Sequence, residues 1–154
     1  MISKNSIDST NTPLKPSEAA SAQKRVLLVE DDRSVRRYLE VTLQRAGYDV
    51  ITASDGLEAM KLALGSPVDV VLTDAVMPHM SGQEFARFMR ATPKLSQIPI
   101  VLLTGQENKQ AMAPAEKLVD VFLNKPVRIE ELKSCLVELL SAPARLTLTL
   151  PTTD

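Results

Sequence analysis

Acidic side chains follow two of the apolar runs in this sequence, at the points where those runs end. Glu30 and Asp31 come directly after residues 26–29, and Asp74 comes directly after residues 68–73. Carboxylates that lie close together raise one another's pKa unless a cation lies among them. Oxygen ligands without histidine or cysteine partners are typical of Mg²⁺ sites. These acids therefore indicate a magnesium site, provided that the fold brings them together.

Two other polar side chains end later apolar runs. Thr104 follows residues 98–103, and Lys125 follows residues 119–123 after one intervening asparagine. A lysine ammonium and a hydroxyl are suitable donors to phosphate oxygens. Phosphoryl transfer needs mainly positioning and electrostatic stabilisation, and a carboxylate can form an acyl phosphate. Asp74 is the natural nucleophile of such a site.

Each of these residues also has an ordinary structural explanation. Acids after a strand commonly cap the following helix and stabilise it by about 0.3 to 1 kcal/mol, and we assign that role to Asp32. Taken singly, Asp74 would be a loop acid, Thr104 a turn residue and Lys125 a solvated charge. Ligands of open parallel sheets, however, bind outside the carboxyl ends of the strands. The shared position at strand ends therefore favours a functional site.

The elements that would position these side chains alternate along residues 25–141. Apolar runs rich in valine, isoleucine and leucine predict strands at 26–29, 49–53, 68–73, 98–103 and 119–123. Helical spacing predicts helices at 34–46, from 55 to about 65, after Ser81, and from Ile129 to about Ser141. Residues 107–117 are a weaker helix candidate because Pro114 would break an interior hydrogen bond. This alternation is typical of an α/β protein with a parallel sheet.

Apolar spacing also predicts which helix residues enter the core. In the helix at 34–46 these are Val35, Leu39, Leu43 and Ala46. In the next helix they are Leu57, Met60, Leu62 and Leu64.

Length and composition predict one folded domain with two short flanking segments. The chain has 154 residues, about the size of one domain. Residues 1–24 lack apolar periodicity, so we expect a flexible arm before the domain at 25–141. In residues 142–154 leucines alternate with threonines between two prolines, which leaves a mobile tail or an added edge strand as the two interpretations.

Charge and hydropathy exclude several classes of function. The chain is 44% hydrophobic and has a formal net charge of −1, with 18 basic and 19 acidic side chains. This balance supplies no basic surplus for binding nucleic acid. Neither a signal sequence nor an apolar run of about 18 residues is present, so we expect a cytoplasmic protein without membrane association. The single cysteine, Cys135, fits a reducing compartment.

The motifs together resemble the receiver domain of bacterial two-component response regulators. The resemblance covers about residues 25–141 and rests on five short motifs in the order and spacing of the family: LVEDD at 28–32, DG at 55–56, LTDAVMP at 72–78 with Gly82 after it, LT at 103–104, and NKP at 124–126. It implies a flavodoxin-like (βα)5 fold, which is a doubly wound five-stranded parallel sheet of strand order 2-1-3-4-5.

The resemblance also implies a role for each residue at the strand ends. Asp74 would be the phosphoacceptor, and Glu30 and Asp31 would hold Mg²⁺ together with Asp74 and the backbone carbonyl of Val76. Lys125 would contact the phosphoryl group, and the bond from Lys125 to Pro126 would be cis.

Two further residues would transmit the signal in a receiver domain. Thr104 would be the switch hydroxyl that moves toward the phosphoryl oxygens, and Phe122 the switch aromatic that follows it inward. Gly105 replaces the alanine usual in the family, and the stretch with Pro114 replaces an alanine- and glycine-rich approach to the last strand. Both departures lie on the face that would carry the output.

The implied function is a phosphorylation-controlled switch of protein–protein interactions. A partner histidine kinase or histidine phosphotransfer protein would donate the phosphoryl group. A target protein would bind the face formed by residues 107–117, the strand at 119–123 and the last helix. The chain would catalyse only its own phosphorylation and dephosphorylation, and would act on no separate substrate.

Three other functions compete with this one. A phosphorelay intermediate would pass the phosphoryl group on to a histidine phosphotransfer protein. A Mg²⁺-dependent aspartyl-phosphate phosphatase would need a second acid two residues after its nucleophile, where this chain has Val76. A constitutive pseudo-receiver would have lost some of the acids, the threonine or the lysine, all of which are present here.

Overall fold

The computed structural model describes residues 23–105 and 117–141. The strands are β1 (Arg25–Val29), β2 (Asp49–Ala53), β3 (Val70–Asp74), β4 (Ile100–Thr104) and β5 (Val121–Asn124). The helices are α2 (Arg33–Arg45), α3 (Gly56–Gly65), α4 (Gly82–Ala91) and α5 (Ile129–Ser141), with a short 3₁₀ helix, η2 (Pro93–Leu95), after α4.

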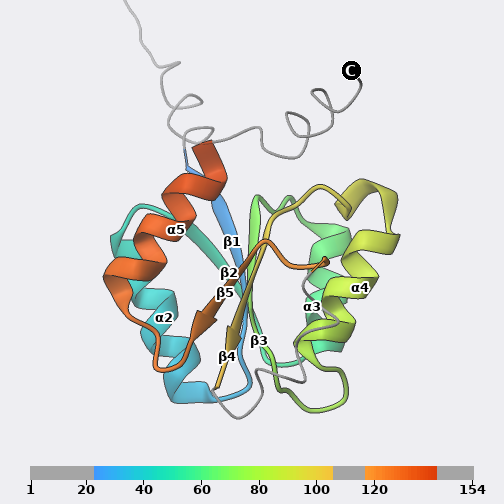
Figure 1. Ribbon diagram of the computed structural model, residues 1–154, viewed down its shortest axis with the longest axis horizontal. Helices are drawn as coiled ribbons and strands as arrows, with labels where there is room; N and C mark the ends of the chain where they lie inside the picture. Colours follow the sequence, from blue (N-terminus) through green and yellow to red (C-terminus); the bar gives the residue numbers. More distant parts are fainter. Residues whose placement is uncertain (1–22, 106–116, 142–154) are drawn as a thin grey trace, which may run out of the picture.

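The strands form a single parallel sheet whose order is β2-β1-β3-β4-β5. Helices α2 and α5 cover one face of the sheet, and α3 and α4 cover the other (Figure 1). This is the doubly wound flavodoxin-like arrangement of strand order 2-1-3-4-5, so the expected fold is confirmed.

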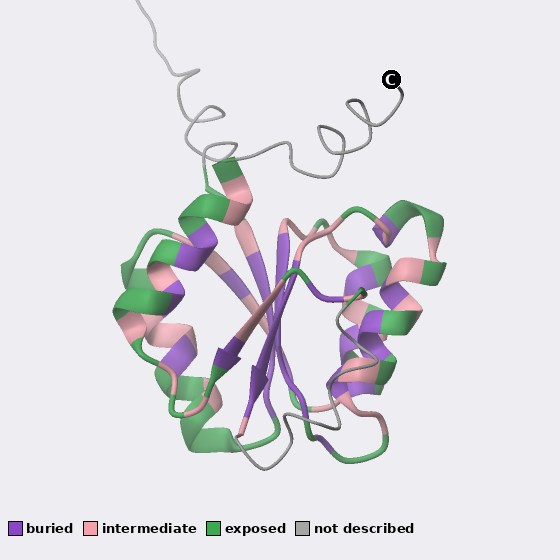
Figure 2. Cartoon of the chain, viewed as in Figure 1, coloured by how far each residue is buried: buried purple, intermediate pink, exposed green. Residues whose placement is uncertain are grey.

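The core lies on both faces of the three central strands, which are buried almost throughout (Figure 2). Successive side chains of a strand point to opposite faces. In β1, Leu27 packs into the cluster beneath α3 and α4, whereas Leu28 packs into the cluster beneath α2 and α5. Leu102 and Leu103 of β4 divide in the same way. A continuous apolar run therefore fills two cores, as expected for a strand buried on both faces.

The predicted core residues of two helices are partly wrong. Leu57 and Leu64 are 52% and 45% exposed, and the buried residues of α3 are Gly56, Ala59 and Ala63. These small side chains let α3 lie close to its neighbours, so the larger leucines lie outside the contact. In α2, Leu39 and Leu43 are buried as predicted, whereas Val35 and Ala46 are exposed.

Helix caps fix where the helices begin. Ser81 and Glu84 form the complete capping box that the sequence predicts at α4. At α3, the Asp55 side chain accepts a hydrogen bond from the Glu58 amide, but Glu58 accepts from the amide of Ser54 and not from that of Asp55. The reciprocal bond therefore lies one residue earlier than in a capping box.

Three strands begin two residues later and end one residue later than predicted, and each ends on a polar residue. Asp74 is the last residue of β3, Thr104 of β4 and Asn124 of β5. Asp69 lies before β3 and not inside it, and its carboxylate accepts a hydrogen bond from the amide of Arg25 at 2.8 Å. The ladder hydrogen bonds therefore hold Asp74 and Thr104 in place up to the edge of the sheet.

Several predictions concern residues outside the described ranges. The flexible arm falls largely on residues 1–22, the weaker helix candidate at 107–117 almost entirely on 106–116, and the tail on 142–154. Among the helices that the structure describes, none is long and apolar enough to cross a membrane.

Candidate functional site

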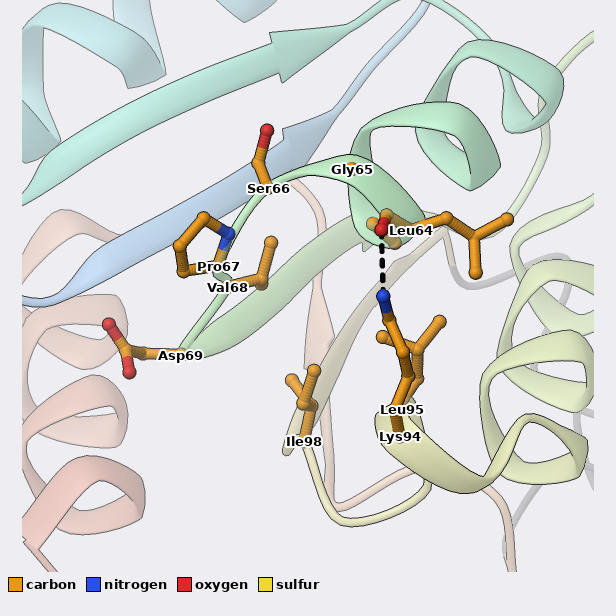
Figure 3. Close-up of a pocket in the computed structure, with 10 residues that line it drawn as sticks. Leu64, Gly65, Ser66, Pro67, Val68, Asp69, Lys94, Leu95 and Ile98 are labelled. Carbon is orange, nitrogen blue, oxygen red and sulfur yellow. Dashed lines mark hydrogen bonds between the residues drawn. The ribbon is translucent and has the colours of Figure 1, made fainter.

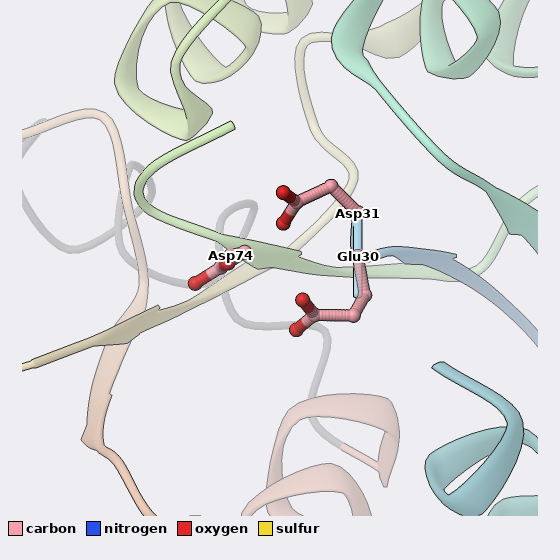
Figure 4. Close-up of side chains that lie close together, drawn as sticks. All are labelled: Glu30, Asp31 and Asp74. Carbon is pink, nitrogen blue, oxygen red and sulfur yellow. The ribbon is translucent and has the colours of Figure 1, made fainter. Parts of the chain in front are cut away.

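The sequence-predicted acids meet at the carboxyl edge of the sheet. Glu30 and Asp31 follow β1, and Asp74 ends β3, the strand that pairs with β1. Each of the three side chains offers a carboxylate oxygen, and these oxygens lie within 4.8 Å of one another (Figure 4). Glu30 and Asp74 are buried, whereas Asp31 is exposed. The sheet thus collects three negative charges at one partly open site.

Lys125 reaches this cluster from the turn after β5. Its Nζ lies 2.6 Å from Oδ1 of Asp74, and the Ala75 amide donates to the same oxygen at 3.0 Å. Asp74 is only 4% exposed. Burial raises the pKa of Asp74, which Lys125 opposes, and the negative partner raises the pKa of Lys125 despite the burial of that group. The pair thus holds a buried carboxylate and an ammonium group in direct contact.

The surroundings of Glu30 fit a bound cation. Its Oε2 accepts a hydrogen bond from the Asp32 amide at 3.0 Å, but its buried Oε1 has no hydrogen-bond partner among the described residues. Burial is the main cause that raises the pKa of Glu30 to about 7. A buried carboxylate oxygen without a partner is costly. The hard oxygen donors around it fit a divalent cation such as Mg²⁺.

Thr104 and Phe122 occupy the strands next to this cluster. Thr104 is 2% exposed, and its hydroxyl donates to the carbonyl of Gly105 at 3.0 Å, so it does not hydrogen-bond Asp74. The backbone carbonyl of Thr104 accepts from the amide of Lys125 at 2.9 Å. Phe122 is half-buried and packs against the cluster beneath α3 and α4. The hydroxyl and the aromatic ring therefore lie on adjacent strands, β4 and β5.

The loop after β3 is held tightly against the site. The amide of Gly82 donates to the carbonyl of Ala75 at 2.9 Å. A Cβ added at Gly82 would overlap the carbonyl oxygen of Asp74, so glycine is required there. Val76 lies in this loop with 57% of its surface exposed. The bond from Lys125 to Pro126, in the loop on the other side of the site, is cis as the resemblance implies.

Comparison with known proteins decides the family. The family model of the response regulator receiver domain matches residues 26–137. The chain belongs to this family. The relatives of this receiver domain include the response regulator MprA of Mycobacterium sp. (strain KMS), which is 38% identical over 109 residues, or 70% of this chain and 46% of that protein. The chain therefore spans less than half the length of that relative.

Two solved structures and one further relative are similar to this receiver domain. The chemotaxis response regulator CheY4 of Vibrio cholerae has a TM-score of 0.70 and 35% identity, covering 77% of this chain and 99% of that chain. TrrA of Thermotoga maritima, solved in complex with Mg²⁺-BeF, has a TM-score of 0.70 and 33% identity over 77% and 100%. The sensor kinase/phosphatase CqsS of Vibrio cholerae is 31% identical over 131 residues, covering 76% of this chain and 19% of that protein.

One residue at the site of this receiver domain was missed by the sequence reasoning. Arg36, in the first turns of α2, donates from Nη1 to the backbone carbonyl of Glu30 at 2.9 Å. It thereby ties the end of β1 to the helix that follows. A guanidinium that binds a backbone carbonyl leaves no pattern of residue types, so no signal in the sequence could have shown this contact.

A separate pocket lies at the opposite edge of the sheet. This pocket of about 420 Å³ is lined by the end of α3, the residues before β3 and β4, and η2 (Figure 3). Inside it, Lys94 donates from Nζ to the carbonyl of Leu64 at 2.8 Å. None of the acids at the carboxyl edge lines it. The titratable groups with raised pKa values lie at the carboxyl edge and not in this pocket, so they identify the carboxyl edge as the candidate site.

Proposed function

We propose that this receiver domain accepts a phosphoryl group on Asp74 from a partner phosphohistidine, with Mg²⁺, and thereby switches protein–protein interactions in two-component signalling. The observation that carries this proposal is the contact of Lys125 with Asp74 at 2.6 Å, beside two further carboxylates. A nucleophile, a cation and a metal-binding acid pair are what phosphoryl transfer to a carboxylate needs. The chain catalyses only its own phosphorylation and dephosphorylation.

The oxygen that attacks phosphorus is Oδ2 of Asp74. In the described part of the chain, the Asp74 carboxylate makes its contacts through Oδ1, which accepts hydrogen bonds from the Lys125 ammonium and the Ala75 amide. Oδ2 forms the new bond to phosphorus as the bond from phosphorus to the donor imidazole nitrogen breaks. That nitrogen keeps the electron pair, and the product is an acyl phosphate on Asp74.

Charge stabilisation comes from both sides of the phosphoryl group. Glu30, Asp31 and Asp74 would hold Mg²⁺ with the carbonyl of Val76, and the bound ion would supply positive charge to the phosphoryl oxygens. Lys125 contributes its ammonium from the side of β5. The residues therefore balance the negative charge that gathers in the transition state.

The output of the switch begins at Thr104. A phosphoryl group adds about 1.5 to 2 negative charges and three acceptor oxygens. We infer that the Thr104 hydroxyl leaves the carbonyl of Gly105 to donate to one of these oxygens, and that Phe122 fills the space behind it. The surface around β5 and α5 then differs between the two states, and a target protein reads the difference.

Intact mass measurement tests the proposal. The purified protein is incubated with Mg²⁺ and acetyl phosphate, and the expected result is one added phosphoryl group. Asp74→Asn removes the nucleophile and is expected to abolish the addition, as is a metal chelator. Asp55→Asn is the matched control, because asparagine also caps a helix and should retain normal addition.

Two results would overturn the proposed function. The first is full addition to the Asp74→Asn variant. The second is the absence of addition to the wild type from both acetyl phosphate and a panel of histidine kinases, which would favour a constitutive interaction module.

A phosphorelay role is the second candidate. The relatives of this chain include the sensor kinase CqsS, and a similar solved structure is the signal receiver domain of a histidine kinase from Syntrophus aciditrophicus, with a TM-score of 0.74 and 28% identity over 79% of this chain and 93% of that chain. A relay intermediate would return its phosphoryl group rapidly to a histidine phosphotransfer protein. Measuring the loss of added mass with and without such a protein separates the two roles.

A further inference from the structure

Arg90, in the last turn of α4, makes an unusually complete set of contacts for an arginine. Its side chain is only 13% exposed. Nε donates to the carbonyl of Leu118 at 2.9 Å, and Nη1 donates to the carbonyls of Ser96 and Ile98 at 2.9 and 2.7 Å. Nη2 lies 2.9 Å from Oδ2 of Asp120. These partners lie immediately before β4 and immediately before β5.

Asp120 joins the same guanidinium to the sheet. Its Oδ2 accepts a hydrogen bond from the amide of Ile100 at 2.8 Å, and its own amide donates to the carbonyl of Ile100 at 2.9 Å. Ile100 is the first residue of β4, and Val101 is paired with Val121. Asp120 therefore fixes, through both its main chain and its side chain, the point at which β5 begins to pair.

The register of β5 depends strongly on this point. In the described part of the chain, β5 has four residues and pairs only with β4. A slip of one residue turns every side chain of a strand to the opposite face and moves it by about 3.3 Å along the strand. Phe122 would leave the cluster beneath α3 and α4. Lys125, at the other end of β5, would lose its contact of 2.6 Å with Asp74.

We propose that Arg90 and Asp120, here called the β5 latch, are positioning residues that hold β5 in the register which places Lys125 on Asp74. The guanidinium is tied to backbone carbonyls and to one carboxylate, so it fixes main-chain positions and does not merely fill space. The latch lies at the amino-terminal edge of the sheet and acts through β5 on the phosphorylation site at the carboxyl edge. This inference rests on the proposed function in so far as Lys125 assists phosphoryl acceptance.

A double-mutant cycle tests whether the latch acts through Lys125. Asp120→Ala is expected to slow phosphoryl acceptance from acetyl phosphate by about 10- to 100-fold, because a small displacement of a catalytic group costs this much. In a Lys125→Gln background the same substitution should have almost no further effect, since the group that it positions is gone. Equal slowing in both backgrounds would overturn the proposal, because it would show that Asp120 does not act through Lys125.

Hydrogen exchange tests the latch independently of any phosphorylation. Arg90→Met should increase exchange of the β5 amides while exchange in β1 stays unchanged. Arg87→Met is the matched control, because Arg87 is exposed on the same helix. Asp120→Asn is a milder variant for use if Arg90→Met does not fold. Equal protection of the β5 amides in the Arg90 and Arg87 variants would overturn the latch.

The two tests also separate failure of the latch from failure of the proposed function. If the wild type accepts no phosphoryl group, the proposed function fails and the exchange measurement alone decides the latch. If the wild type is phosphorylated and Asp120→Ala reacts at the wild-type rate, the latch fails and the proposed function stands.

Discussion

At the scale of single residues, the contact of Lys125 with Asp74 dominates the site. The ammonium stabilises the carboxylate in a buried position and would stabilise the phosphoryl oxygens during transfer. Lys125→Gln is expected to slow phosphoryl acceptance by about 10²- to 10³-fold, the usual cost of losing one stabilising donor. Intact mass as a function of time measures the rate. Lys61→Gln removes an exposed lysine and should react as the wild type does.

The pKa of Asp74 provides a second test of the Lys125→Gln variant. Burial raises the pKa of Asp74 and Lys125 opposes the rise. Removing Lys125 should therefore move the acid limb of the pH–rate profile to higher pH. An unchanged acid limb would contradict the assigned contact, whatever the rate.

The raised pKa of Glu30 predicts that the free energy of unfolding depends on pH in metal-free buffer. Its pKa is about 7 in the folded protein against 4.5 for the free group, so the folded state binds more protons between these values. Stability therefore falls as pH rises from about 4.5 to 7, by about 1 to 3 kcal/mol. Urea unfolding at several pH values measures the slope, which Glu30→Gln should largely remove. Glu138→Gln, an exposed substitution, should keep the slope, and equal slopes in both variants would refute the assignment.

At the scale of secondary-structure elements, the packing of α4 against the end of β3 sets the geometry of the site. Gly82 begins α4, and an added Cβ would overlap the Asp74 carbonyl and crowd Leu102. Gly82→Ala is therefore expected to destabilise the protein by about 1 to 3 kcal/mol and to slow phosphoryl acceptance. Urea denaturation measures the first effect and intact mass the second.

Another glycine offers a matched control for this prediction. Gly65 ends α3 and has no atom within 4 Å of an added Cβ. Gly65→Ala should leave stability unchanged or raise it by about 0.4 to 1 kcal/mol. Similar losses in both variants would show that the contact with Asp74 is not the cause.

The strands and helices also show which features could be predicted from the sequence alone. Continuous apolar runs predicted the central strands because both of their faces are buried, and the polar residues at the ends marked Asp74, Thr104 and Lys125. Apolar spacing was misleading in α3, where alanines rather than Leu57 and Leu64 meet the core. The cause is close packing between elements, which depends on backbone distances that a residue pattern does not record.

Hydrogen bonds from arginine side chains to backbone carbonyls also could not be predicted from the sequence. Arg36 binds the carbonyl of Glu30, and Arg90 binds three carbonyls from two loops. Any residue offers a carbonyl, so the partners of these arginines have no characteristic type. The structure was needed to find them, whereas the acids of the candidate site could be predicted because each must be a particular residue type.

At the scale of the whole molecule, we expect cation binding and folding to be coupled. The acid cluster repels itself in the folded state, and a divalent cation bound there relieves the repulsion. Mg²⁺ should therefore raise the free energy of unfolding, by about 2.7 kcal/mol at 100 times its dissociation constant. Thermal denaturation with and without Mg²⁺, at constant ionic strength, measures the effect.

A variant of the exposed acid identifies the site of this stabilisation. Asp31→Asn removes one carboxylate at the open side of the cluster and should abolish most of the response to Mg²⁺. Asp55→Asn should respond as the wild type does. An undiminished response in Asp31→Asn would place the ion elsewhere on the molecule.

If Asp74 is the phosphoacceptor, the phosphoryl group can be located at that position on the chain. Protein treated with acetyl phosphate and Mg²⁺ is reduced with borohydride, which converts an aspartyl phosphate to homoserine, and the peptides are then sequenced by mass spectrometry. We expect homoserine at position 74 and at no other aspartate. Homoserine at Asp31 or Asp32 with aspartate retained at 74 would contradict this expectation.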